Sequence, residues 1–359
     1  MELSFGYYVY DPETFGFSSG HLFVSLRSAA QWMFTDAICA LYRNDRQAAR
    51  QDVHALVQLC EFNKEDPLLS SQMFRVAITG PSLALTWEAL QSPDWNEEEL
   101  AFFQKDWEQV DMFQAALTGF LGGRALMEME FGMIRSNGFR NTLRRMIPGN
   151  NGSQTWETIK DIPASSIWRL SAEKNELFAF KQYQGALECV RNLDHLPWPE
   201  IHAREVALQI ESGNTFDGGK IGFGLKHYQY AMSALIIPNT AGYTQVINRH
   251  EAFRRLTITA IALKRFQLRR RHLPAELNEL VPEFISAVPI DPMNIQPLHY
   301  RLNADGTFVL YSVGEDGKDD GGDPTPTNSK SPPDLWNARD AVWPAAEESS
   351  NIQAPSTRE

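Results

Sequence analysis

Apolar residues recur at three- and four-residue intervals through most of the chain before residue 272, a spacing typical of helices that bury one face. The pattern breaks at Asn44–Asp45, at 63–67 and at Gly80–Pro81, where the proline is expected to end or kink a helix. A loop is expected over 148–163. The pattern predicts helices over about 26–41, 48–60, 73–78, 94–110, 172–192 and 246–272.

The first four helices are joined by short turns and are expected to pack as hairpins. Asp94 precedes a helical run and Glu97 follows three residues later, which is the spacing of a capping box. Ala40, Asp45 and Ala48 resemble the turn of a tetratricopeptide (TPR) hairpin. Only one such copy is legible, whereas repeat solenoids need about three. We therefore expect an antiparallel bundle or a short solenoid with one TPR-like hairpin.

The helical spacing of apolar residues ends after Leu273. Pro274 fits the first position of a short helix. Residues 298–302 then alternate as a strand, 303–306 form a turn, and 308–313 return as a second strand. The expected fold is therefore mainly α: a helical-hairpin bundle or short solenoid, followed by a small α+β module with a long helix and an antiparallel β-sheet.

The chain divides into four predicted parts. Residues 1–22 are rich in aromatic residues, glycine and serine, and are expected to form an extended lead-in. An α-helical domain is predicted over 23–248, and the α+β module with its acidic loop over 249–344. The last part, 345–359, is polar and expected to be disordered.

The charge of the chain is negative and unevenly placed. Its formal net charge is −12, and residues 303–359 hold 11 acidic and 4 basic residues. Nucleic-acid binding needs clustered lysine and arginine, so no nucleic-acid partner is expected. The acidic end suits cations or is simply solvated.

One basic cluster stands against this acidic background, on the helix predicted over 246–272. It can contact a partner or a lipid headgroup, or its last members can simply complement the helix dipole, which we favour. Its members are Arg254, Arg255, Lys264, Arg265, Arg269, Arg270 and Arg271.

Motifs for catalysis are weak. The glycine-rich stretch 212–220 lacks Walker spacing, because Lys220 is followed by isoleucine. A GxSxG match at 16–20 has too little chain before it for the sheet that a nucleophile elbow requires. The three cysteines form no CxxC pair and are expected to be buried free thiols. We therefore expect no enzyme activity.

The sequence shows no run of 18 apolar residues, so no membrane span is expected. No signal peptide is visible at the first residues, although an export signal can lie outside the given sequence. The sequence alone therefore leaves the compartment open.

The strongest candidate site is the loop after Gly314. It holds five carboxylates within nine residues, together with several glycines that let backbone carbonyls turn inward. Calcium takes six to eight oxygen ligands of these kinds, so a calcium site and a solvated loop are about equally expected. The carboxylates are those of Glu315, Asp316, Asp319, Asp320 and Asp323.

The order of elements over about 252–343 is similar to that of a known protein family. It consists of a long helix ending at Leu273–Pro274, a leucine-rich short helix, the turn Pro289-Ile290-Asp291-Pro292, and a strand ending in Tyr311-Ser312-Val313-Gly314 before the acidic loop. This segment resembles the globular part of type II secretion major pseudopilins. The whole chain resembles uncharacterised bacterial envelope proteins that join a helical region to a pseudopilin-like end.

The resemblance implies a calcium ion held in the loop and closed by a short strand like Asp340–Trp343. It suggests calcium ligands at Asp316, Asp323 and Asp340, with Asp319 and Asp320 as alternatives. It also implies a location outside the cytoplasm, in the periplasm or cell envelope.

We therefore expect a non-enzymatic envelope scaffold that binds a protein or peptide and carries a structural calcium site. One alternative is a cytosolic TPR-like adaptor with a solvated acidic tail. Another is an enzyme, such as a hydrolase, whose site forms only in the folded chain.

Overall fold

The structure is a computed structural model, which describes residues 20–62, 64–92, 94–137, 166–216, 233, 241–327 and 335–343. The first 19 residues of the expected lead-in, the expected loop at 148–163 and the expected tail lie outside the described residues, whereas residues 20–22 of that lead-in belong to a helix. The helices are α1 (Gly20–Tyr42), α2 (Arg46–Cys60), α3 (Leu69–Gln91), α4 (Glu97–Gln109), α5 (Met112–Asn137), α8 (Ser166–Arg191), α9 (Trp198–Phe216) and α12 (Ala241–Arg270).

A small antiparallel β-structure follows the helices and a short 3-10 helix, Leu277–Leu280. Two strands, β1 (Ile290–Asp291) and β2 (Gln296–Pro297), form one pair. Three more, β3 (His299–Leu302), β4 (Phe308–Ser312) and β5 (Ala341–Trp343), form a sheet in that order. The fold class expected from the sequence, mainly α with a small antiparallel sheet at the C-terminal end, is confirmed.

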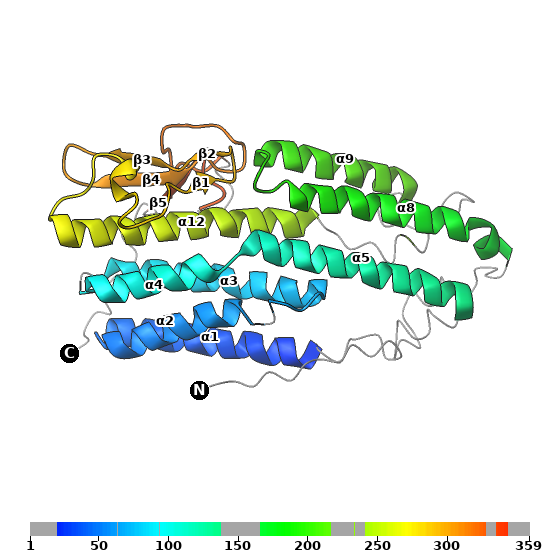
Figure 1. Ribbon diagram of the computed structural model, residues 1–359, viewed down its shortest axis with the longest axis horizontal. Helices are drawn as coiled ribbons and strands as arrows, with labels where there is room; N and C mark the ends of the chain where they lie inside the picture. Colours follow the sequence, from blue (N-terminus) through cyan, green and yellow to red (C-terminus); the bar gives the residue numbers. More distant parts are fainter. Residues whose placement is uncertain are drawn as a thin grey trace, which may run out of the picture.

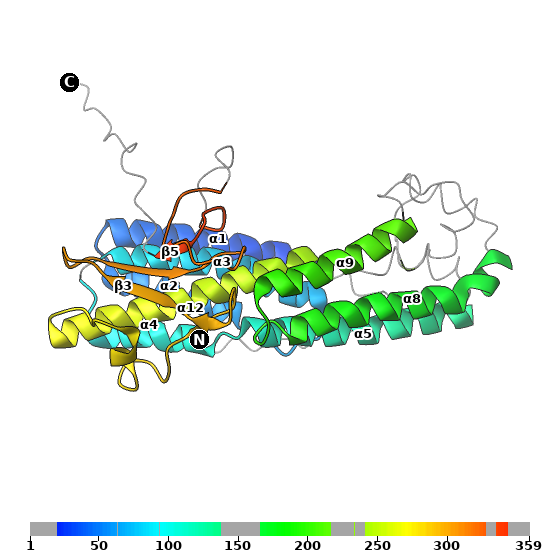
Figure 2. The ribbon, with the colours of Figure 1, turned by 90° about the horizontal axis from the view of Figure 1, so that it is seen from above.

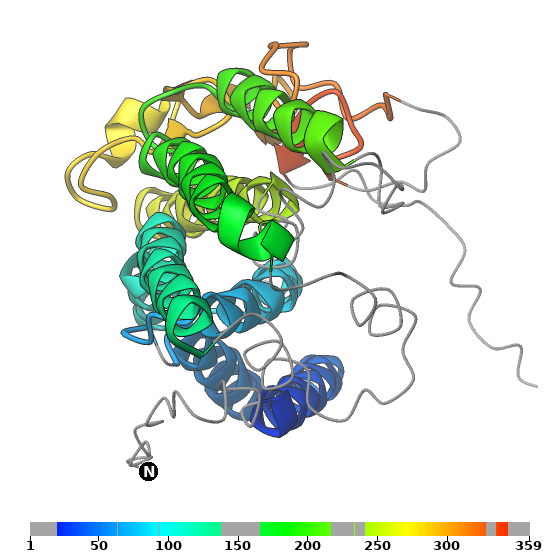
Figure 3. The ribbon, with the colours of Figure 1, turned by 90° about the vertical axis from the view of Figure 1, so that its right-hand side faces the viewer.

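The elements stack in layers, with the pair α1 and α2 at one side and the β-sheet at the other (Figure 1). Between them lie α3, α4 and α5, and then α12 (Figure 1). Seen from above, α8 and α9 extend together beyond the sheet, alongside α5 (Figure 2). The end-on view shows α1, α3 and α12 following one another across the fold (Figure 3). No helix among the described residues is long and apolar enough to span a membrane.

The central element is α12, which packs against α3, α4, α5 and α9 and also against β4. Most of its apolar side chains are buried, among them Leu256, Ile261 and Leu263. The boundary expected between residues 248 and 249 falls inside this helix. The helical part and the C-terminal module therefore share one helix and one hydrophobic core.

The Gly80–Pro81 pair does not end the helix, because α3 continues through Pro81 to Gln91, so the expectation of a helix break there is wrong. A proline inside a helix removes one hydrogen bond, and tertiary packing offsets that loss. Here α3 packs against α1, α2, α5 and α12. Gly80 lies so close to α12 that an added Cβ would be 2.9 Å from the His250 ring.

The capping box of α4 lies two residues later than expected. The N-cap is Asn96, whose side chain accepts a hydrogen bond from the Glu99 amide at 2.9 Å. Glu99 returns the bond, since its carboxylate accepts from the Asn96 amide at 3.0 Å. The candidate pair Asp94 and Glu97 has the same spacing, but the indole of Trp95 is buried and donates to the Ala89 carbonyl, which holds that residue in the turn before the helix.

Most members of the basic cluster on α12 form ion pairs within the chain. Arg265 pairs with Glu97 of α4 at 2.8 Å. Arg269 and Arg270 both pair with Glu283, which follows the 3-10 helix. These cations fasten α12 to its neighbours, so complementing the helix dipole is only part of their role.

A buried carboxylate completes this network. Glu251 is 3% exposed and pairs with Arg254 at 2.8 Å and with Arg255 at 2.6 Å. The two guanidinium groups also reach outward: Arg254 donates to the Trp107 carbonyl of α4 and Arg255 to the Ile290 carbonyl of β1. Although burial opposes its charge, the two arginines hold the pKa of Glu251 below its usual value. The network therefore joins α4, α12 and the β-structure at one point.

Candidate functional site

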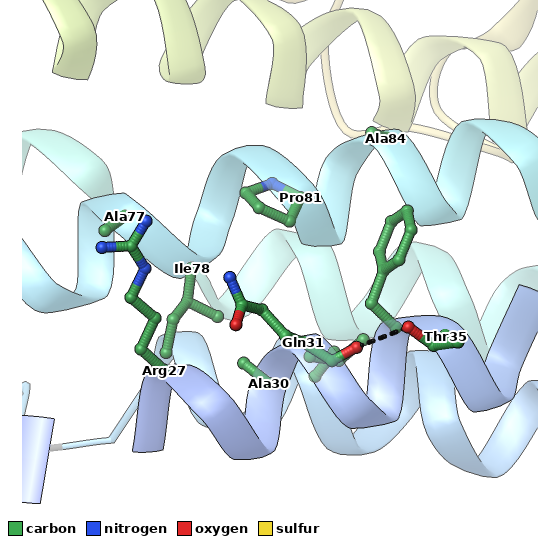
Figure 4. Close-up of a pocket in the computed structure, with 10 residues that line it drawn as sticks. Arg27, Ala30, Gln31, Thr35, Ala77, Ile78, Pro81 and Ala84 are labelled. Atoms are coloured by element: carbon green, nitrogen blue, oxygen red, sulfur yellow. Dashed lines mark hydrogen bonds between the residues drawn. The ribbon is translucent and has the colours of Figure 1, made fainter. Parts of the chain in front are cut away.

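A mainly apolar cavity of about 470 Å³ lies in a groove between α1 and α3 (Figure 4). Its floor is made of buried residues from three helices: Ala30 of α1, Leu56 of α2 and Ile78 of α3. The wall on the α3 side is formed by Ala77, Pro81 and Ala84. We name this cavity the α1–α3 groove.

Short side chains keep the α1–α3 groove open. Positions 77, 81 and 84 are four and three residues apart, so they lie on one face of α3. Alanine and proline there fill little of the space between the two helix backbones, whereas longer residues such as leucine would occupy it. The groove is thus a consequence of residue size along one helical face.

Pro81 also gives the groove a polar feature. Proline has no N–H, so it cannot donate the helical hydrogen bond that the Ala77 carbonyl would receive from residue 81. Both residues line the groove and are exposed. The helix therefore lacks the hydrogen bond from residue 81 to the Ala77 carbonyl along this wall.

The opposite wall belongs to α1 and is more polar. Arg27, Gln31 and Thr35 recur every four residues and lie along its exposed edge. Figure 4 shows Arg27 and Ala77 at one end of the groove and Thr35 and Ala84 at the other. The two helices therefore run in the same direction, as successive first helices of a repeat hairpin would.

Large aromatic side chains stand exposed on the same helix. Trp32 is 74% exposed and Tyr42 is 81% exposed. Single exposed apolar residues are ordinary, but tryptophan and tyrosine are the types most enriched at protein interfaces.

In the acidic loop, Asp340 is the closing residue, and it is completely buried. Its carboxylate accepts backbone hydrogen bonds from Asp320 (3.3 Å), Gly322 (2.8 Å) and Asp323 (2.9 Å). Burial is the main cause that raises the pKa of Asp340, and these three amide donors offset part of it. Its own amide donates to the Asp323 carbonyl at 3.0 Å, so β5 is fastened to the loop in both directions.

The other predicted ligands point to separate partners. Asp316 is exposed and accepts from the Lys318 amide, and Asp319 accepts from the Tyr311 hydroxyl at 2.9 Å. Arg339 places its guanidinium 3.6 Å from both Asp320 and Asp323. The fifth carboxylate of the loop, that of Glu315, pairs with Arg249 of α12 at 2.6 Å.

In this structure the loop carboxylates face protein groups and are not gathered around one point. Calcium needs several oxygens aimed at one point, whereas the oxygens of Asp340 face amide donors and a guanidinium lies beside Asp320 and Asp323. Across the described parts of the chain, no group of three or more histidine, cysteine or acidic side chains is gathered closely enough to hold a metal ion. The calcium site stays a prediction from the resemblance.

A second buried carboxylate, which the sequence analysis did not single out, holds the two β-structures together. Asp291 accepts from the Ser312 hydroxyl, the Val313 amide and the Met293 amide, at 2.9, 2.9 and 3.0 Å. Burial raises the pKa of Asp291. A signal was present, because Asp291 is the one charged residue of the proline-framed turn and lies between apolar residues.

The arrangement that comes nearest to catalytic geometry is the pair His54 and Asp106. The imidazole Nδ1 lies 2.7 Å from the Asp106 carboxylate, which also receives a long hydrogen bond from Gln58. In the described part of the chain, no hydroxyl or thiol hydrogen-bonds to this imidazole. Burial raises the pKa of the Cys60 and Cys189 thiols to about 11, so they stay protonated at neutral pH and are poor nucleophiles.

The expectation of buried thiols holds for Cys60 and Cys189, while Cys39 is only partly buried. All three are free.

Comparisons with known proteins give no family: no protein-family model matches the chain, and no curated protein or solved structure matches it. The α1–α3 groove and the acidic loop must therefore be interpreted from their own chemistry.

Proposed function

We propose that this protein is a non-enzymatic scaffold that binds a segment of another protein, or a peptide, in the α1–α3 groove. The observation that carries the proposal is the groove itself: about 470 Å³, apolar at its floor and open along two parallel helices. Grooves of this kind receive the apolar face of an amphipathic helix.

The build of the groove supports the proposal, because its floor is rigid. Leu56 and Ile78 are buried in the same hydrophobic core that contains α12. A preformed binding surface avoids the entropic cost of ordering it when the partner arrives. The long helix α12 and the β-structure thus brace the helices that carry the groove.

A groove-filling variant tests the proposal. A library of random peptides of about 15 residues, which span about 22 Å as a helix, is selected against the wild-type protein. The selected peptides should lose about tenfold or more in affinity when Ala77→Trp fills the groove, since a bulky ring takes the space of the ligand. Ala77 is exposed, so the folded state should tolerate the substitution.

The matched control is Ala203→Trp, which adds the same ring at an exposed alanine on α9. It should leave the affinity unchanged. Peptides that bind wild type and Ala77→Trp equally well would show that the groove is not the binding surface.

The envelope location and the structural calcium ion remain parts of the proposal that rest on the pseudopilin resemblance. Because Asp340 already closes the acidic loop through amide donors, the alternative of a cytosolic adaptor without a metal ion also has a specific observation in its favour. Both versions use the same groove, and calcium distinguishes them.

Thermal unfolding with and without calcium decides between these versions. From the geometry, Asp340→Asn should cost about 1–3 kcal/mol of stability both in excess EDTA and in millimolar calcium. The substitution weakens the three hydrogen bonds that backbone amides donate to the buried side chain. Asp316→Ala should change the melting temperature little in either condition, since that side chain is exposed. A melting temperature that rises with calcium but not magnesium, and a rise that Asp316→Ala abolishes, would instead support the calcium site.

A further inference from the structure

Opposite charges bracket the α1–α3 groove. Arg27 lies at the end where α1 faces Ala77 (Figure 4). At the other end, Glu88 follows Ala84 by four residues on α3, so it lies one turn beyond the groove on the same helical face. The groove therefore has a positive end and a negative end.

Neither charge is neutralised within the described part of the chain. Arg27 and Glu88 form no ion pair there, and both side chains are exposed. Partial burial raises the pKa of Glu88 above its usual value, and no cation lowers it. The contrast with α12 is informative, because there Arg265 and Arg269 are matched with acidic partners on neighbouring elements.

We propose, resting on the function proposed above, that the partner of the α1–α3 groove is an amphipathic helix with charges of opposite sign at its two ends. An acidic side chain of this helix faces Arg27 and a basic side chain faces Glu88. From Ala77 to Glu88 is 11 residues, or about 16 Å along α3. The two charges of the partner are therefore about three turns apart, with its apolar face between them.

The geometry favours this occupant over a purely apolar one. A helix with only apolar residues would fill the groove but would leave both charges without a counterpart at its rim. Rim charges contribute mainly to specificity and to the rate of association. The expected gain from each pair is modest, about two- to fivefold in affinity, because both side chains remain exposed to solvent.

The test uses synthetic helical peptides that share one apolar face and differ only at two positions 11 residues apart. One peptide carries glutamate and lysine there, one carries two glutamines, one two glutamates and one two lysines. Affinities for the full-length protein are measured at low and high salt. The glutamate–lysine peptide should bind about four- to twenty-fold more tightly than the two like-charged peptides at low salt, and the difference should shrink at high salt.

Charge-reversal variants assign each pair. Glu88→Lys should shift the preference to the peptide with two glutamates, and Arg27→Glu should shift it to the peptide with two lysines. The control is Glu98→Lys, an equal change of charge at an exposed site on α4, which should leave the order of affinities unchanged. Melting temperatures confirm that all the variants fold.

The outcomes separate the two proposals. If the four peptides bind equally well, and Ala77→Trp abolishes their binding, the groove binds partners but the charge pairing is wrong. If no peptide of either experiment binds in the groove, the proposed function fails as well. If the protein self-associates and Arg27→Glu abolishes that association, the occupant is a second copy of this chain, which overturns the inference.

Discussion

Replacing Glu251 with alanine should lower the free energy of unfolding by about 3–5 kcal/mol, measured by urea denaturation at neutral pH. The substitution leaves Arg254 and Arg255 without their carboxylate in a site where their side chains are only 14% and 13% exposed. An uncompensated buried charge is among the most destabilising changes that a single substitution can make.

The loss of stability should extend beyond the ion pairs of Glu251. Arg254 and Arg255 hold the carbonyl groups of Trp107 and Ile290, so their displacement loosens α4 and β1 together. The control is Asp194→Ala, which removes the other acidic partner of Arg255. Asp194 is 53% exposed, so its loss should cost far less than that of Glu251. Equal losses for the two variants would mean that burial does not decide the energetics of this network.

Replacing Gly122 with alanine should cost about 2–3 kcal/mol, again measured by urea denaturation, although alanine is the better helix former. An added Cβ at this position would overlap the carbonyl oxygen of Pro67, in the turn before α3. Backbone atoms cannot step aside as the end of a flexible side chain can. The helix α5 must therefore shift away from α3.

The control for this substitution lies in another helix. Gly242, near the start of α12, has nothing within 4 Å of an added Cβ. Gly242→Ala should therefore stabilise the protein by up to about 1 kcal/mol, because only the helix propensity changes. If Gly122→Ala also stabilised the protein, the close approach of α5 to the Pro67 turn would not exist in solution.

Helical periodicity predicted much of the fold, because one apolar face per helix is a local signal. The expected helix 48–60 became α2, and the strand pair 298–302 and 308–313 became β3 and β4 with small shifts. The sequence also showed that Pro81 lacks the N–H for a helical hydrogen bond. The tolerance of this proline inside α3 was not predictable, since it depends on helices that are distant in the sequence.

The groove could not be predicted, for the same physical reason. Ala77, Pro81 and Ala84 look like ordinary small residues until α1 is placed opposite them. Likewise, the basic residues of α12 have the same pattern whether they face solvent or Glu97 and Glu251. In the acidic loop the orientation of the carboxylates depends on where Asp340 enters, which the sequence does not show.

The position of α12 sets the order in which this chain can fold. Arg265 forms an ion pair with Glu97 and donates a hydrogen bond to Gln104. Both partners precede it by more than 150 residues in the sequence, so they are synthesised first. At a synthesis rate of about 5–20 residues per second, the first helices wait on the order of 10–30 s on the ribosome for this partner. Until then, the buried surfaces of α3 and α4 that contact α12 stay open, and α1 to α5 cannot complete their core. We therefore expect the nascent chain to be most prone to aggregation just before α12 emerges.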